Sequence, residues 1–135
     1  MKTKNLCKKL NHKLYLSNNI KLALKLNLDG AYIPAFNKDF RGNSYSPKKK
    51  FKLIGSAHNI RELRAKELQK VDYLFISPLF LSKKNKKELG IYRFLNLSRK
   101  TKKKIICLGG INKDNIKKID LIKPYGIAAI SYFQN

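Results

Sequence analysis

The stretch IICLGGINKDNI, residues 105–116, holds the pattern that decides the fold. An apolar run leads into Gly109 and Gly110, and apolar residues then recur at helical spacing. Such a run, followed by glycine and by a period of about 3.6 residues, is typical of a strand, a tight turn and a helix. Asn112 can cap that helix, because its side chain can accept a hydrogen bond from an unpaired backbone N–H.

The glycine pair leaves two interpretations open. Glycine allows positive φ and close approach of a ligand to the backbone, and the N–H groups at a helix start attract anions. These properties predict a phosphate-binding turn at Gly109 and Gly110. The alternative is that the turn requires glycine for its geometry alone. The stretch by itself does not decide between them.

The same unit recurs along the chain. The patterns predict strands at 14–16, 30–33, 51–55, 73–77, 105–109 and 126–130, and helices at 3–11, 19–27, 59–70, 91–99 and 112–121. In the helix at 59–70, Asn59 is the expected cap and Glu62 can pair with Lys66 one turn later. Apolar strands that alternate with helices imply an α/β fold with a parallel sheet and helices outside it.

Length and composition narrow the class of protein. A chain of 135 residues corresponds to one domain with a real core. It has no apolar run near the roughly 20 residues of a membrane span and no apolar signal-peptide core, so we expect a cytoplasmic protein. Cys7 and Cys107 are far apart and lack metal-binding spacing. We therefore predict no metal site from the cysteines.

The net charge is +23, from 31 basic and 8 acidic residues. Such a charge attracts phosphorylated ligands, nucleic acids and anionic membranes. However, the basic residues are mostly lysines spread along the whole chain, whereas arginine is the usual reader of base edges. We therefore expect a solvated basic surface, with no membrane or nucleic-acid partner.

Polar residues and glycines follow the predicted strands, where parallel sheets bind ligands. These positions are Ser17-Asn18, Asn37, Ser56 to His58, Ser77 to Asn85, Gly109-Gly110 and Ser131. They include no pair of carboxylates, so candidates for acid–base chemistry are few. The sequence predicts a site at this edge of the sheet.

Five segments carry a family resemblance, in this order: LYLSNNIKLALKLNLDGAYI, IGSAHNIREL, DYLFISPLF, IICLGGINKDNI and YGIAAIS. Together they resemble thiamine phosphate synthase and its relative, the TenI-type thiazole tautomerase, over essentially the whole chain from about residue 5. The resemblance implies a parallel β/α barrel of the TIM type and a role in thiamine biosynthesis.

The resemblance also implies an incomplete barrel. Only about six strands are expected, and the family's first two βα units have no counterpart, so residues 1–135 would be a single domain that lacks the family's N-terminal part. An open sheet edge of this kind invites pairing, and we expect self-association there.

The resemblance assigns substrate-binding roles. Gly109, Gly110, Ile130 and Ser131 would hold the phosphate of the thiazole substrate, or of thiamine phosphate. In the long loop after residue 77, Ser82 and Lys84 would contact substrate. The implied reaction joins a pyrimidine diphosphate to thiazole phosphate.

The implied cofactor is Mg²⁺, but the two acids of the family's metal site read as Asn18 and Asn37 here. An amide brings no charge and is a weaker Mg²⁺ ligand. The family's Gln/Arg/Lys diphosphate motif also falls in the part without counterpart. Whether the chain is an active synthase or a degenerate one is therefore left open.

Two other functions stay open. In the tautomerase branch a histidine in the turn that matches Ser56 and His58 acts as general acid and base, and an imidazole with a pKa near ~6.5 suits this role. Alternatively, these two residues begin and cap the helix at 59. The third hypothesis is a non-catalytic remnant whose basic surface binds polyanions.

Overall fold

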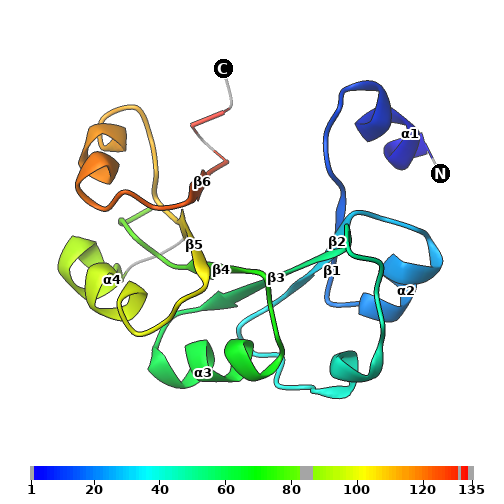
Figure 1. The fold of residues 1–135 in the computed structure, drawn as a ribbon. Helices are drawn as coiled ribbons and strands as arrows, with labels where there is room; N and C mark the ends of the chain where they lie inside the picture. Colours follow the sequence, from blue (N-terminus) through cyan, green and yellow to red (C-terminus); the bar gives the residue numbers. More distant parts are fainter. Residues whose placement is uncertain (1, 83–86, 131, 134–135) are drawn as a thin grey trace.

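A computed structural model describes residues 2–82, 87–130 and 132–133, and shows a curled, open half-barrel of parallel strands with helices on its outer side (Figure 1). The strands are β1 (Tyr15–Ser17), β2 (Gly30–Ile33), β3 (Lys52–Ala57), β4 (Tyr73–Ile76), β5 (Lys104–Leu108) and β6 (Gly126–Ala128). Each strand pairs in parallel with the next, so spatial order equals chain order. The predicted barrel-type α/β fold is confirmed.

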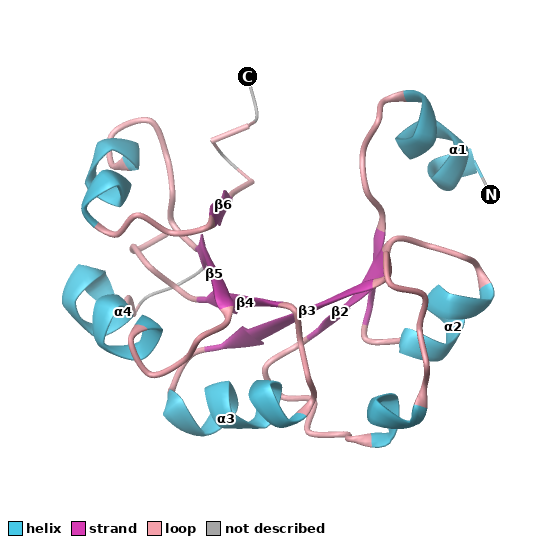
Figure 2. Ribbon diagram, viewed as in Figure 1, coloured by secondary structure: helices cyan, strands magenta, loops and turns pink. Residues whose placement is uncertain are grey.

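One helix precedes β1, and the others connect successive strands across the outer face (Figure 2). They are α1 (Lys2–Lys9), α2 (Ile20–Lys25), α3 (Ile60–Leu68) and α4 (Gly90–Ser98), with 3-10 helices η1 (Arg41–Ser44) and η2 (Ile116–Leu121). None of the helices in the described ranges is both long and apolar enough to cross a bilayer.

The main core lies between the outer face of the sheet and these helices. Fully buried side chains from β4 and α3, among them Leu74, Ile76 and Leu63, pack there with Phe94 of α4 and Cys107 of β5. Alternate residues of each strand face the inside of the curl. By this alternation the inner face carries aromatic side chains, and the rings of Tyr32 and Phe75 lie 5.8 Å apart.

The predicted helix at 112–121 is wrong in type and extent. Residues 113–115 form a turn, and only Ile116–Leu121 is helical, as the 3-10 helix η2. Asn112 Oδ1 accepts from the N–H groups of Asp114 and Asn115 at 2.9 and 3.1 Å, and Asn115 Oδ1 accepts from Asn112 N at 2.9 Å. Asparagine side chains that bond nearby backbone compete with α-helix formation, which accounts for the difference.

The helix near residue 59 begins as predicted but pairs its charges differently. Asn59 is the N-cap, and its Oδ1 accepts from Glu62 N at 3.0 Å. The predicted Glu62–Lys66 pair is wrong, because Lys66 is fully buried and its Nζ donates to Asn37 O in the loop after β2. Glu62 instead accepts a hydrogen bond of 2.7 Å from His58 N.

Candidate active site

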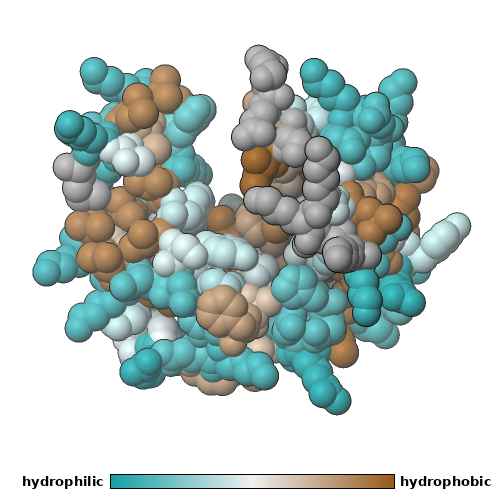
Figure 3. Space-filling model, turned by 180° about the vertical axis from the view of Figure 1, so that it is seen from behind, coloured by the Kyte–Doolittle hydropathy of each residue, from teal (hydrophilic) through white to brown (hydrophobic). Residues whose placement is uncertain are grey.

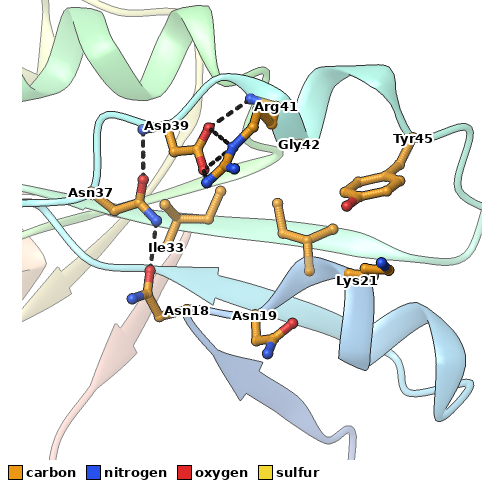
Figure 4. Close-up of a pocket in the computed structure, with 10 residues that line it drawn as sticks. Asn18, Asn19, Lys21, Ile33, Asn37, Asp39, Arg41, Gly42 and Tyr45 are labelled. Atoms are coloured by element: carbon orange, nitrogen blue, oxygen red, sulfur yellow. Dashed lines mark hydrogen bonds and ion pairs between the residues drawn. The ribbon is translucent and has the colours of Figure 1, made fainter.

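A cavity of about 420 Å³ lies beyond the carboxyl ends of β1 and β2 (Figure 4). Ligands of parallel α/β sheets bind at this edge, so the cavity is where the sequence predicted a site. It is lined by Asn18, Asn19, Ile20, Lys21, Ile33, Asn37, Asp39, Arg41, Gly42 and Tyr45.

Two amide side chains from different strand ends meet in this cavity. Asn37 Nδ2 donates a hydrogen bond of 2.6 Å to Asn18 Oδ1, and Asn37 Oδ1 accepts from Asp39 N at 2.7 Å. Asn18 has a φ of 56°, which asparagine tolerates better than most residues, and its N–H donates to Tyr32 O at 2.7 Å. The amide pair therefore ties the loop after β2 to the end of β1.

The one carboxylate that lines this cavity is already paired. Arg41 Nε lies 2.8 Å and its terminal nitrogen 2.7 Å from Asp39 Oδ2. The hydrogen bonds from Arg41 hold the pKa of Asp39 below its ordinary value. Lys21, on the opposite side of the cavity, has no ion-pair partner within the described ranges. The cavity therefore carries net positive charge.

These residues do not fit a magnesium ion. Mg²⁺ is held by one or two carboxylates in octahedral geometry, but Asn18 and Asn37 bond to each other and Asp39 bonds to Arg41. Within the described part of the chain, no group of three or more His, Cys, Asp or Glu side chains is placed to hold a metal ion. The cofactor implied by the resemblance thus finds no suitable ligand set here.

A buried lysine, Lys66, holds the loop that lines one side of the cavity. Lys66 Nζ donates to Asn37 O at 2.6 Å and to Gln69 Oε1 at 2.8 Å, and Gln69 Nε2 donates to Asp39 O at 2.9 Å. A Cβ on Gly55 would lie 2.8 Å from Lys66 Cδ, so this glycine leaves room for the lysine stem. Burial lowers the pKa of Lys66 to about 8, since loss of water disfavours the charged form. We infer that Lys66 and Gln69 position the loop at 37–39.

Ser56 and His58 lie near the next strand end but in different surroundings. Ser56 is buried in β3, and its Oγ accepts from Tyr32 OH at 2.9 Å. His58 is half exposed, with Nδ1 2.9 Å from Glu62 Oε2. Burial alone would raise the pKa of Glu62, but hydrogen bonds from His58 outweigh it and lower that pKa. Within the described ranges, no hydrogen bond joins Ser56 to His58.

Gly109 and Gly110 form the tight turn after β5, with φ values of 100° and 66°. A Cβ on Gly109 would lie 2.8 Å from Pro78 Cα, and one on Gly110 would collide with the Phe80 carbonyl oxygen. Packing against the segment after β4 therefore requires glycine at both positions. Within the described ranges, the N–H groups of the two glycines make no hydrogen bond.

The rest of the predicted phosphate site is placed only in part. The predicted helix N-terminus with unpaired N–H groups is absent. The element here is the short 3-10 helix η2, and the N–H groups of Asn112 and Asp114 already donate to asparagine side chains. Ile130 is 69% exposed after β6. Ser131 and Lys84 lie outside the described residues. Ser82 lies in the segment before them, and nothing in the structure tests the substrate roles of these residues.

Of the residues that line the cavity, sequence reasoning singled out Asn18 and Asn37 and missed others, among them Lys21, Arg41 and Tyr45. Lys21 is the second residue of α2, and the other two lie in or beside η1, which was not predicted. The only available signal was their position soon after predicted strands. That signal is weak in a chain where basic residues are common throughout.

Comparison with known proteins identifies the relatives of this chain. A family model described as thiamine monophosphate synthase matches residues 1–133. The thiamine-phosphate synthase of Prochlorococcus marinus strain SARG is 32% identical over 133 residues, which cover 93% of this chain and 37% of that protein. The Helicobacter pylori enzyme of strain 26695 is also 32% identical, over 97% of this chain and 61% of its own length. The chain thus spans roughly two fifths to three fifths of these relatives.

Solved structures agree on the fold. A thiamine phosphate pyrophosphorylase from Pyrococcus furiosus superposes with a TM-score of 0.74 at 19% identity, covering 94% of this chain and 61% of that one. A thiamine phosphate pyrophosphorylase from Bacteroides thetaiotaomicron gives a TM-score of 0.52 at 21% identity, covering 85% of this chain and 53% of that one. At these identities the likeness supports the barrel-type fold.

Proposed function

Because the chain belongs to the thiamine monophosphate synthase family, we propose that it acts in thiamine biosynthesis by joining a pyrimidine diphosphate to thiazole phosphate. We treat residues 1–135 as a single domain of that family. In this reaction the thiazole nitrogen attacks the methylene carbon of the pyrimidine, a C–N bond forms, and diphosphate leaves with the electrons of the broken C–O bond.

The observation that carries the proposal is that two features suited to anions lie along one sheet edge. The cavity with Lys21 and Arg41 lies after β1 and β2, and the Gly109-Gly110 turn lies after β5. A positively charged cavity suits a diphosphate, and open N–H groups at a glycine turn suit a phosphate. In this proposal the two phosphorylated substrates bind along the same edge of the sheet.

In this proposal the chain's own side chains provide charge and position. Lys21 attracts the leaving diphosphate, and Arg41 lies across the cavity in its pair with Asp39. The Asn18–Asn37 pair and Lys66 fix the loop that leads to Arg41. Gly109 and Gly110, with Ile130 and Ser131, hold the thiazole phosphate. We assign no step to Mg²⁺, because the residues present do not fit it.

The test compares two ligands by calorimetry. Thiazole phosphate should bind more tightly than its dephosphorylated alcohol, and Gly110→Ala should remove the preference by blocking the backbone. Gly90→Ala is the matched control, since Gly90 also has positive φ but has no atom within 4 Å of an added Cβ. Equal binding of both ligands by the unaltered chain would overturn the phosphate site. Product formation from both substrates then tests the reaction separately.

A second function rests on His58. Its Nδ1 is held by Glu62 at 2.9 Å and its side chain is half exposed, so Nε2 can exchange protons with a ligand. This arrangement suits tautomerisation of a thiazole phosphate. The test measures proton exchange at the thiazole ring by NMR in D₂O. His58→Gln should abolish this exchange and leave thiazole phosphate binding unchanged.

We also propose a cytoplasmic location, in keeping with a biosynthetic family, and self-association through β1. Within the described residues, β1 has a neighbouring strand on one side only. A second copy that covers this edge would satisfy its backbone groups. Sedimentation of the chain as a folded monomer at all concentrations would refute self-association.

A further inference from the structure

A basic segment, RKTKKK at 99–104, lies at the end of the sheet opposite the cavity. It connects α4 to β5 and therefore reaches the sheet at the amino ends of the strands. The candidate active site uses the carboxyl ends. The two regions are thus distinct, and the proposed synthase reaction gives this segment no role.

The fold converts this segment into a concave surface. With two residues of α3 it borders an open cavity of about 500 Å³, lined by Arg64, Glu67, Arg99, Lys100, Thr101, Lys102 and Lys103. Figure 3 shows hydrophilic side chains projecting around the rim of one face of the molecule. The cavity differs from that general surface because two elements distant in sequence, α3 and the 99–104 segment, line it together.

The single carboxylate of this cavity is already neutralised. Glu67 Oε2 accepts from Arg64 at 2.6 Å, and Glu67 Oε1 accepts from Thr101 Oγ1 at 2.6 Å. Burial alone would raise the pKa of Glu67, but these hydrogen bonds outweigh it and lower that pKa. Within the described ranges, Arg99 and the cavity's lysines form no ion pair. Their charge is therefore available to an external anion.

Aromatic rings adjoin the same segment. Lys104 Nζ lies 4.6 Å from the ring centre of Tyr125. The rings of Tyr73 and Tyr125 stack with centres 5.5 Å apart, and Tyr125 is 60% exposed just before β6. The ring thus lies at the Lys104 end of the basic segment, beyond the residues that line the cavity. Cations followed by an exposed ring suit a strand of phosphates with unstacked bases. A single small phosphate would need neither the length nor the ring.

We propose that this surface, defined by Arg64, residues 99–104 and Tyr125, binds the backbone of single-stranded nucleic acid. The lysines contact successive phosphates, and Tyr125 stacks on a base. The sequence predicted a merely solvated basic surface, because its lysines are spread along the whole chain. Four of the cavity's five basic side chains come from the 99–104 segment itself; the tertiary structure adds the concave shape and Arg64, which pairs with Glu67.

The test measures fluorescence anisotropy of a labelled oligo-dT of about 12 nucleotides, a length within the usual site range. The triple variant K100Q/K102Q/K103Q is compared with K113Q/K117Q/K118Q. The control changes three exposed lysines around η2 and lowers the net charge equally. Circular dichroism checks that both variants fold.

K100Q/K102Q/K103Q should weaken binding by about tenfold or more. It should also reduce the slope of log K against log salt by about 2, because each lost phosphate contact removes roughly 0.7 from the slope. The control should change affinity by less than about threefold. Tyr125→Ala should weaken binding by about fivefold or more with an unchanged slope.

Equal weakening by both triples would overturn the proposal, because diffuse net charge would then explain binding. Equally tight binding of a duplex of the same length would overturn the single-strand assignment. Binding to vesicles of anionic phospholipid with no binding to the oligonucleotide would also overturn it.

Discussion

Restoring acids at Asn18 and Asn37 should create a magnesium site that the natural chain lacks. The 2.6 Å contact between Asn37 Nδ2 and Asn18 Oδ1 shows that the two side chains already meet. In N18D/N37D, two carboxylate oxygens would replace that donor–acceptor pair. Like charges at this separation repel unless a cation lies between them.

The size of the effect follows from the geometry. If the two charges relax to about 4 Å apart, their repulsion is about 1 kcal/mol in water and about 4 kcal/mol at an effective dielectric constant near 20. The lost hydrogen bond adds about 1 kcal/mol. Because Asn18 is exposed and Asn37 is half-buried, we expect a loss of about 2–3 kcal/mol in the free energy of unfolding.

Urea unfolding with and without millimolar MgCl₂ measures this change. Magnesium should return about 1–3 kcal/mol to N18D/N37D by binding the folded state only, and should leave the natural chain unchanged. The control N5D/N96D places two acids on the exposed surfaces of α1 and α4, with the same change in net charge. Magnesium should not stabilise it.

Two results would refute this reasoning. Stabilisation of the unaltered chain by magnesium would show that the amide pair does not exclude the ion. Equal stabilisation of N18D/N37D and N5D/N96D would show that magnesium acts through net charge alone.

Three further outcomes are expected. Gly110→Ala should lower the free energy of unfolding by about 2 kcal/mol or more in urea, because positive φ costs about 1–2 kcal/mol and the new Cβ meets the Phe80 carbonyl; a loss no larger than that of Gly90→Ala would count against the contact. The pKa of Lys66 is about 8 in the folded chain, below the ordinary 10.5, so the unfolded chain binds more protons between these two pH values. The free energy of unfolding should therefore rise with pH in this range. Lys66→Met should flatten this rise in urea titrations. Iodoacetamide at about pH 8 should label Cys7 well before Cys107, because burial raises the pKa of Cys107 to about 11, and equal rates would contradict that burial.

Much of the fold could be predicted from the sequence because its signals are local. Apolar runs of strand length, followed by helical spacing, place all six strands close to their observed positions. Gly109 and Gly110 were also found in this way, since a turn with positive φ selects glycine strongly. The family resemblance rests on such segments in order, and the comparisons confirm it.

The candidate site depended on contacts between segments distant in sequence, which no local pattern reports. Sequence position marked Asn18 and Asn37 as separate strand-end residues, whereas folding joins them in one hydrogen bond. Lys66 read as an exposed partner for Glu62, yet the space left by Gly55 and the carbonyl of Asn37 draw it into the core. Thus the sequence alone determined the order of strands and helices, through periodicity and turn chemistry. Only tertiary packing decided which polar groups neutralise one another and which, like the lysines of the 99–104 segment, keep their charge for a ligand.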